Sequence, residues 1–361
     1  MIPYHPVTLP VSVFFVANGF LQLYYAIVLR RKFPGHNFAD SVVTFALWIF
    51  AALAYPFVYR TDPSRLDRVR DFQALSNWLV CGFTPLVIFL ILEYQRRLVK
   101  RRPELRRERT IENFLERFEV ESDEGEKYPI RTDLKRKMLH FVPAFLIVGL
   151  WLFATRVWAG WWRADEYWGI SGEDFGYFLI LTVGYGGIFV FAALDYVRLS
   201  HVFSGRFNLY HLLPNNVLDL LGKAMKRKEL NEFIKTVPLI LAMIPALLLL
   251  PFGLFAAVGL SATVADGAAS TFGKALGRVH WPKNSPKTVA GYLAGGLTNF
   301  FLTLAISSAF ESYSLAQAVA LALASAATFV AVDVLNPPLD DNLLNPLACG
   351  LVLALVLNLA F

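Results

Sequence analysis

Apolar residues gather in blocks of about 18 positions or more, separated by polar or strongly charged segments. A helix of that length crosses the roughly 30 Å hydrocarbon core of a bilayer. The fold class that we expect is therefore all-α, a polytopic transmembrane helical bundle of about ten helices. The pattern predicts helices at residues 10–29, 41–59, 75–93, 138–157, 176–195, 236–251, 253–265, 289–310, 315–334 and 343–361.

Prolines interrupt the predicted sixth and seventh helices, at Pro238, Pro245 and Pro251. The seventh helix, 253–265, is also short for a full span. Breaks at membrane depth occur where the backbone lines a cavity or packs against protein, because lipid offers no hydrogen-bond partners. We expect a broken or re-entrant pair of helices in this part of the chain.

Lysine and arginine give the orientation, since cytoplasmic loops carry an excess of both. The first helix ends in Arg30, Arg31 and Lys32, and alternation from there places 94–137, 196–235, 266–288 and the turn before the last helix on the cytoplasmic side. Both termini then lie outside. Within the cytoplasmic segments, 96–137 and 203–231 have apolar residues at helical spacing and are expected to be interfacial helices.

Composition agrees with a membrane protein, because 56% of the residues are hydrophobic. The formal net charge of +6 reflects cytoplasmic loops and anionic lipid rather than nucleic acid. Cys81 and Cys349 lie inside apolar blocks and are expected to be small core residues. The chain begins without a basic segment and cleavage site, so we expect the first apolar block to remain as a helix.

Polar clusters occur at four predicted cytoplasmic helix ends, where charge is costly and needs a reason. The first is Arg136-Lys137-Met-Leu-His140, for which a positive anchor with one interfacial histidine is the simpler interpretation. The second is Asp195 with Arg198, three positions apart on one helix face, for which a structural salt bridge is expected.

The third cluster runs from Asp266 to Gly295 and combines an acid, small residues and the lysines Lys274 and Lys287. Such a set suits a metal-bound polyphosphate: the acid binds Mg²⁺, the lysines neutralise phosphate oxygens, and glycines let backbone N–H groups approach. The alternative is that the pairs Gly273/Gly277 and Gly291/Gly295 are helix-packing motifs. Packing does not explain Asp266, Lys274 and Lys287 together.

The fourth cluster is Asp340-Asp341-Asn342, between the last two helices. Two acids beside an amide form an oxygen-rich site for a cation, and a polar turn is the alternative. Because all four clusters fall on one predicted membrane face, we favour a shared site.

Four elements together resemble the polyprenol kinase family, which comprises dolichol kinases, phytol kinases and CTP-dependent diacylglycerol kinases. They are Arg136-Lys137-x-x-His140, Asp266 to Gly277, Lys287-Thr288-x-x-Gly291 and Asp340-Asp341-Asn342-Leu-x-x-Pro346. The central element is also similar to that of the related phosphatidate cytidylyltransferases. Three positions depart from the family pattern. Ala265 stands where the family usually has glycine, and Ala290 where it usually has glutamate. The family often has a glutamate on the penultimate helix, where the nearest acid in this chain is Asp333.

The resemblance implies transfer of the terminal phosphate of CTP to a polyprenol-type lipid alcohol such as dolichol. It covers 131–361 as a catalytic membrane domain of about seven helices, and 1–130 is then an accessory region with three helices and a charged segment. The implied catalytic residues are Asp266, His140 and Asp341, and the implied Mg²⁺ ligands are Asp266, Asp340, Asp341 and Asn342. The implied phosphate-binding residues are Arg136, Lys137, Gly273, Lys274, Gly277, Lys287, Thr288 and Gly291.

The expected partners are a nucleoside triphosphate, an isoprenoid alcohol and membrane lipids, with the site on the cytoplasmic face of a prokaryotic plasma membrane or the endoplasmic reticulum. Two other classes of function stay open. A cytidylyltransferase-like synthase uses similar carboxylates but releases pyrophosphate. A transporter or scaffold uses the clusters as gates or anchors, and broken helices fit a transporter.

Overall fold

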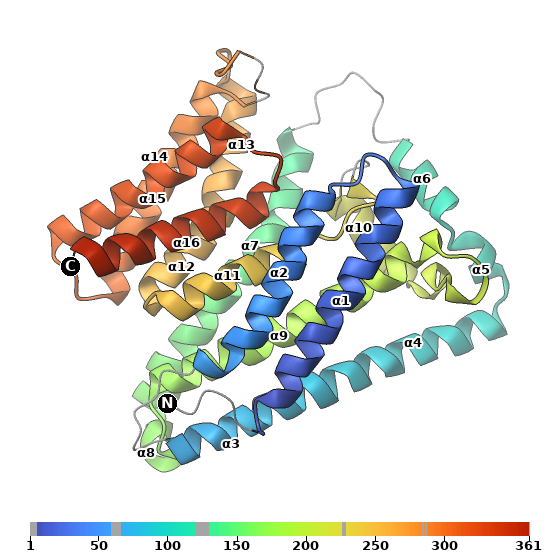
Figure 1. Ribbon diagram of the computed structural model, residues 1–361, viewed down its shortest axis with the longest axis horizontal. Helices are drawn as coiled ribbons and strands as arrows, with labels where there is room; N and C mark the ends of the chain where they lie inside the picture. The colour runs from blue at the N-terminus through green and yellow to red at the C-terminus, as the bar shows by residue number, and fades with distance from the viewer. Residues whose placement is uncertain are drawn as a thin grey trace. The chain divides into compact units, whose positions relative to one another are not determined.

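The computed structural model describes residues 6–58, 66–119, 130–225, 229–283, 285 and 287–360 (Figure 1). The protein is 83% helical, and the described part contains no β-strand beyond an isolated bridge between His280 and Thr288. Nine helices in this part are long and apolar enough to cross a membrane, and α11 (Thr236–Leu249) is a shorter apolar helix. The expected all-α, multi-pass helical bundle is confirmed.

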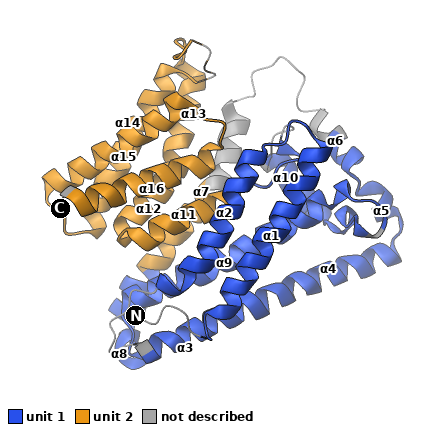
Figure 2. Ribbon diagram, in the orientation of Figure 1, with its two compact units in different colours: residues 1–128, 153–237 blue, residues 129–152, 238–361 orange. Residues whose placement is uncertain are grey.

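The chain forms two compact units (Figure 2). Unit 1 combines residues 1–128 with 153–237, and unit 2 combines 129–152 with 238–361. The sequence prediction placed a single boundary at residue 130 and assigned all later residues to one domain. The structure differs, because 153–237 belongs to the same unit as the N-terminal region. The functional division into an accessory and a catalytic part stays a prediction.

Unit 1 contains four membrane-spanning helices, two of which have extra turns at an end. Its helices are α1 (Leu9–Lys32), α2 (Phe38–Ala54), α3 (Leu66–Asn77), α4 (Thr84–Arg101), α5 (Glu104–Glu108), α6 (Ile111–Glu119), α8 (Ala164–Trp168), α9 (Gly172–Leu199) and α10 (Asn215–Ala224). A π-helical segment, Trp78–Phe83, joins α3 to α4 in one 35-residue helix. The charged segment that the predicted helices 41–59 and 75–93 left between them is therefore helical from Leu66 onward, because its charges lie along a helix that continues into the apolar block.

The two predicted interfacial segments pack on each other at the polar end of unit 1. Residues 96–101 continue α4, and the short helices α5 and α6 follow. Phe114 of α6 is buried against Leu218 and Leu221 of α10 in a small apolar cluster. The helical spacing of apolar residues in both segments thus serves contact between them, as well as any contact with the membrane surface.

A buried ion pair ends α9. Arg198 Nη2 lies 2.8 Å from Asp195 Oδ1, and both side chains are 1% exposed. The guanidinium also donates to the carbonyl oxygens of Leu230 and Glu232, and Asp195 Oδ2 accepts from the Ile234 N–H at 2.7 Å. Because every charged atom has a partner, the pair is tolerated inside the protein and ties 230–234 to α9, as expected for a structural salt bridge.

Unit 2 contains α7 (Ile130–Leu152), most of α11, α12 (Phe252–Leu260), α13 (Asp266–Leu276), α14 (Val289–Phe310), α15 (Leu315–Leu335) and α16 (Asp341–Ala360). The helices α14, α15 and α16 pack in succession, and α13 packs on α14 (Figure 1). The spans predicted at 289–310 and 315–334 agree with the structure to within a residue.

The sequence prediction was wrong for the seventh span. A π-helical turn, Ser261–Ala265, joins α12 and α13 into one apolar helix over Phe252–Leu276. Asp266 therefore lies within a continuous helix and not at its end. The small residues that follow Asp266 continue the helix because they pack against α14. The short member of the proline-rich pair is α11.

Glycine allows α13, α14 and α15 to approach closely. A Cβ on Gly295 of α14 would lie 2.6 Å from Cε1 of the buried Phe329 on α15 and 2.9 Å from Cβ of Ala269 on α13. Small residues at such crossings let membrane helices gain van der Waals contact where the hydrophobic effect contributes little. The packing interpretation of Gly291 and Gly295 is therefore supported.

Replacing Gly295 by alanine should destabilise unit 2 by about 1–3 kcal/mol, because the added methyl forces two packed helices apart. The matched control is Gly149→Ala on α7, where a Cβ meets nothing within 4 Å. Alanine should there be neutral or slightly stabilising, through helix propensity. Thermal unfolding in detergent measures both. Equal midpoints for the two variants would contradict this account of the crossing.

Candidate functional site

Lys287 stands at the centre of a charged cluster in unit 2. It precedes α14, and its Nζ donates to Asp333 Oδ1 at 2.7 Å and to Asp341 Oδ2 at 3.0 Å. Asp333 comes from the last turns of α15, and Asp341 is the first residue of α16. The start of α14 therefore meets the end of α15 and the start of α16, 46 and 54 residues later in the chain, at one ammonium group.

The cluster carries more negative than positive charge. Asp266 of α13 interacts electrostatically with both Asp333 and Asp341, so a third carboxylate lies near the two that hold the lysine. Burial alone would lower the pKa of Lys287, but Asp341 and Asp333 outweigh burial and raise that pKa above its ordinary value. The ammonium stays charged through the neutral range, and its stabilising effect is lost only as the pH rises through the raised pKa.

Of the predicted catalytic acids, the structure brings Asp266 and Asp341 into the same neighbourhood. Asp340 has a local role: its Oδ1 accepts from the N–H and the side-chain amide of Asn342, at 2.9 and 2.7 Å. This is the polar-turn alternative for the fourth cluster, at the start of α16.

The described part of the chain brings the predicted magnesium ligands together only in pairs. No group of three His, Cys, Asp or Glu side chains within the described ranges is placed to hold a metal ion. The oxygens of Asp266 and Asp341 suit Mg²⁺ chemically, but the Lys287 ammonium lies between Asp333 and Asp341, where a cation would sit. The metal set Asp266, Asp340, Asp341 and Asn342 stays a prediction, and no chemical step is derived through it.

Thr288 and the predicted phosphate-binding glycines join α13 to α14. Thr288 Oγ1 accepts from the Gly291 N–H at 3.2 Å and donates to the Gly273 carbonyl at 3.4 Å. The Gly277 N–H donates to the same carbonyl at 3.0 Å. The Gly277 N–H therefore caps the end of α13 and the Gly291 N–H the start of α14, and the Thr288 hydroxyl group joins the two helices. The side chain of Lys274, on the last turn of α13, is exposed.

The first cluster lies on α7 of the same unit. Arg136, Lys137 and His140 are helical, and the positions of their side chains lie outside the described residues. The next residue, Phe141, packs against Gly267, where its Cζ would lie 3.2 Å from an added Cβ. The turn of α7 that follows His140 thus contacts α13 one residue from Asp266.

Sequence reasoning did not anticipate two features of this region. Asp333 was noted as the nearest acid on its helix but not as a partner of Lys287. Asn299, Ser325 and Asn345 are buried on α14, α15 and α16, and each keeps one polar atom without a partner among the described residues. The sequence did hold a signal for the buried Asn299, since Asn299, Thr303 and Ser307 recur every four residues along an apolar helix.

Replacing Lys287 by methionine should destabilise unit 2, because the buried carboxylate of Asp333 would lose its cation. We expect a loss on the order of 3–5 kcal/mol, measured by unfolding in detergent. The double variant Lys287→Met/Asp333→Asn should regain part of this loss. Lys283→Met, at an exposed lysine of the same loop, should have little effect. No recovery in the double variant would show that Lys287 is not stabilised by Asp333.

Comparison of this chain with protein-family models, with curated proteins and with solved structures finds no match. The interpretation of the site therefore rests on its own residues: one lysine held by Asp333 and Asp341, with Asp266 close by, at adjoining ends of membrane-spanning helices.

Proposed function

We propose that the protein is an integral membrane lipid kinase that transfers the terminal phosphate of a nucleoside triphosphate, CTP by resemblance, to a polyprenol-type alcohol such as dolichol. The observation that carries the proposal is the Lys287, Asp333 and Asp341 cluster with Asp266 beside it. It brings a fixed cation together with several carboxylates, two of them at helix ends, and our proposal puts these ends at the depth where a lipid hydroxyl group meets a soluble nucleotide.

The chemistry of phosphoryl transfer matches these groups. The alcohol oxygen forms a bond to the terminal phosphorus, the bond from that phosphorus to the bridging oxygen breaks, and the nucleoside diphosphate leaves. Lys287 supplies positive charge for a phosphate oxygen, and its two carboxylate partners hold it in place. Asp266 or Asp341 accepts the proton of the lipid hydroxyl group, and by resemblance His140 is a further candidate for that role. Arg136, Lys137 and Lys274 are further candidates, by resemblance, for binding the phosphates.

The first test uses the purified full-length protein with labelled CTP or ATP, Mg²⁺ and a panel of lipid alcohols. We expect a nucleoside diphosphate and a lipid monophosphate as products. Pyrophosphate and a CDP-lipid would instead identify a cytidylyltransferase. No turnover with any donor, combined with a folded protein, would favour a transporter or scaffold.

Within that assay, Asp266→Asn should lower turnover by about 100-fold or more, as expected for loss of a general base or a charge-stabilising group. The isosteric amide keeps the shape of the side chain, and unfolding in detergent checks the fold. Asp67→Asn, at a carboxylate that is 94% exposed in unit 1, is the control and should retain full activity. Near-normal turnover of Asp266→Asn would assign this acid a structural role.

The proposal also requires the cluster to face the cytoplasm. Single cysteines at positions 283 and 341, in a background without Cys81 and Cys349, should resist an impermeant thiol reagent added outside intact cells. They should react once the membrane is opened. Strong labelling from outside at both positions would place the site on the opposite face and rule out a cytoplasmic nucleotide as donor.

A further inference from the structure

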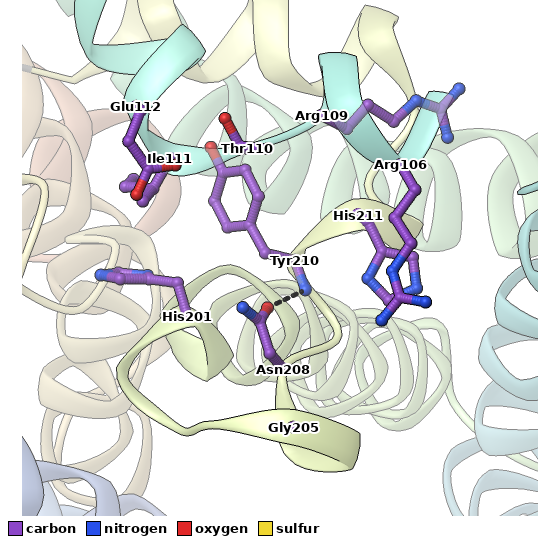
Figure 3. Close-up of a pocket in the computed structure, with 10 residues that line it drawn as sticks. All are labelled: Arg106, Arg109, Thr110, Ile111, Glu112, His201, Gly205, Asn208, Tyr210 and His211. Carbon is purple, nitrogen blue, oxygen red and sulfur yellow. Dashed lines mark hydrogen bonds between the residues drawn. The ribbon is translucent and has the colours of Figure 1, made fainter. Parts of the chain in front are cut away.

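Unit 1 contains an open polar cavity of about 300 Å³, far from the predicted site in sequence (Figure 3). Its walls come from two segments: 106–112, where α5 gives way to α6, and 201–211, which follows α9. Figure 3 shows Arg106 and His211 side by side at one end, with Glu112 and His201 toward the other. The cavity thus has a cationic end.

Arg109 makes the cationic end unusual because its charge is buried without a neutralising carboxylate. The residue is 6% exposed. Its Nε donates to Asn215 Oδ1 and its Nη1 to Gln95 Oε1, both at 3.0 Å, and both acceptors are neutral amides. Burial lowers the pKa of Arg109, which the charge of Glu108 opposes. A buried guanidinium is costly unless an anion lies near it, and no carboxylate among the described residues is hydrogen-bonded to this one.

Two further groups complete that end. The exposed side chain of Arg106 adds a second permanent positive charge beside His211. Burial, followed by the charges of Arg106 and Arg109, lowers the pKa of His211, so its ring is a neutral N–H donor at pH 7. Arginine and a neutral imidazole suit the oxygen atoms of planar or tetrahedral oxyanions. The strongest of these interactions is a bidentate contact between arginine and phosphate.

The chain connectivity places the cavity at the end of two membrane spans. The helix of α4 ends at Arg101, five residues before Arg106, and the span that contains α9 ends at Val202. On the rim segment, Phe207 is 76% exposed and Leu209 is 38% exposed. Exposed apolar side chains next to arginine are typical of protein surfaces that contact headgroups and acyl chains together.

We propose that this cavity binds a phosphate group at the membrane surface, and that an anionic phospholipid with a terminal phosphate headgroup supplies it. Arg106 binds the phosphate oxygens and His211 donates one hydrogen bond. Arg109, whose guanidinium is turned toward Asn215 and Gln95, adds its uncompensated charge from behind, and Phe207 and Leu209 lie toward the acyl chains. The site is independent of the proposed phosphoryl transfer, since it belongs to the other unit and uses none of the same residues.

The test measures binding of phosphatidate to the full-length protein in detergent by native mass spectrometry. Saturable binding is expected, with an affinity at least tenfold weaker for Arg106→Gln and for Arg109→Gln. The matched control is Arg107→Gln, which removes an equally exposed charge from the next position outside the cavity and should stay within twofold of the unaltered protein. Equal effects at 106 and 107 would show unspecific surface attraction and overturn the proposal.

A second arm identifies the source of the phosphate. Inorganic phosphate at millimolar concentration should fail to displace phosphatidate if the acyl chains contribute. Full displacement would make a soluble phosphate compound the ligand and overturn the lipid assignment. Because Arg106 is exposed, its variant should keep the thermal unfolding midpoint of the unaltered protein, so the test does not depend on whether Arg109→Gln folds. Absence of binding by both probes would overturn the site itself.

Discussion

The absence of hydrogen-bond partners in lipid is the constraint on which the rest of this structure depends. It requires the backbone to be helical across the bilayer, and it requires polar side chains inside the bundle to find partners within the protein. The buried charged groups of both units meet the second requirement in the same way. In unit 1, Arg198 and Asp195 are fully partnered, and in unit 2 Lys287 lies between Asp333 and Asp341.

The two charged groups differ in a way that bears on function. Arg198 has no free charge to offer, because its partners are a carboxylate and two backbone carbonyls in a fully buried position. Lys287 is 23% exposed and Asp341 35% exposed, so this cluster is not closed off inside the protein. A pair that is partnered on both sides stabilises the fold, whereas a partly exposed excess of carboxylates around one lysine is suited to exchange its partners for a substrate.

Much of the fold could be predicted because the length of an apolar block is a direct measure of membrane thickness. The spans at 289–310 and 315–334 show how well that works. The prediction failed at Asp266, where a single charged residue was taken as the end of a helix. Hydropathy is a one-dimensional average, and it does not reveal that the small residues after Asp266 pack against α14 and let the helix continue.

The candidate site could be predicted only in part for a similar reason. Motif spacing identified Asp266, Lys287 and Asp341, which the structure brings into one neighbourhood. It did not identify Asp333 as a partner of Lys287, because 46 residues separate them and Asp333 lies in an otherwise apolar run. The sequence supported two roles for the glycines equally, phosphate binding and helix packing. Only the distances between helices distinguish these two roles. Pairing between distant residues is a property of packing, which local pattern does not contain.

The π-helical turn at Ser261–Ala265 has a consequence for how this protein can change over time. Such a turn corresponds to one residue inserted into an α-helix, and one residue advances a helix by about 100° of rotation and about 1.5 Å of length. Deleting any one residue of the turn would leave a regular, equally apolar helix. It would also rotate Asp266 away from Asp333 and Asp341, and Gly273 away from Thr288. The rotation of α13 about its own axis is therefore set by the number of residues before it. A change of length in this turn would disturb the contacts of α13 far more than a substitution would.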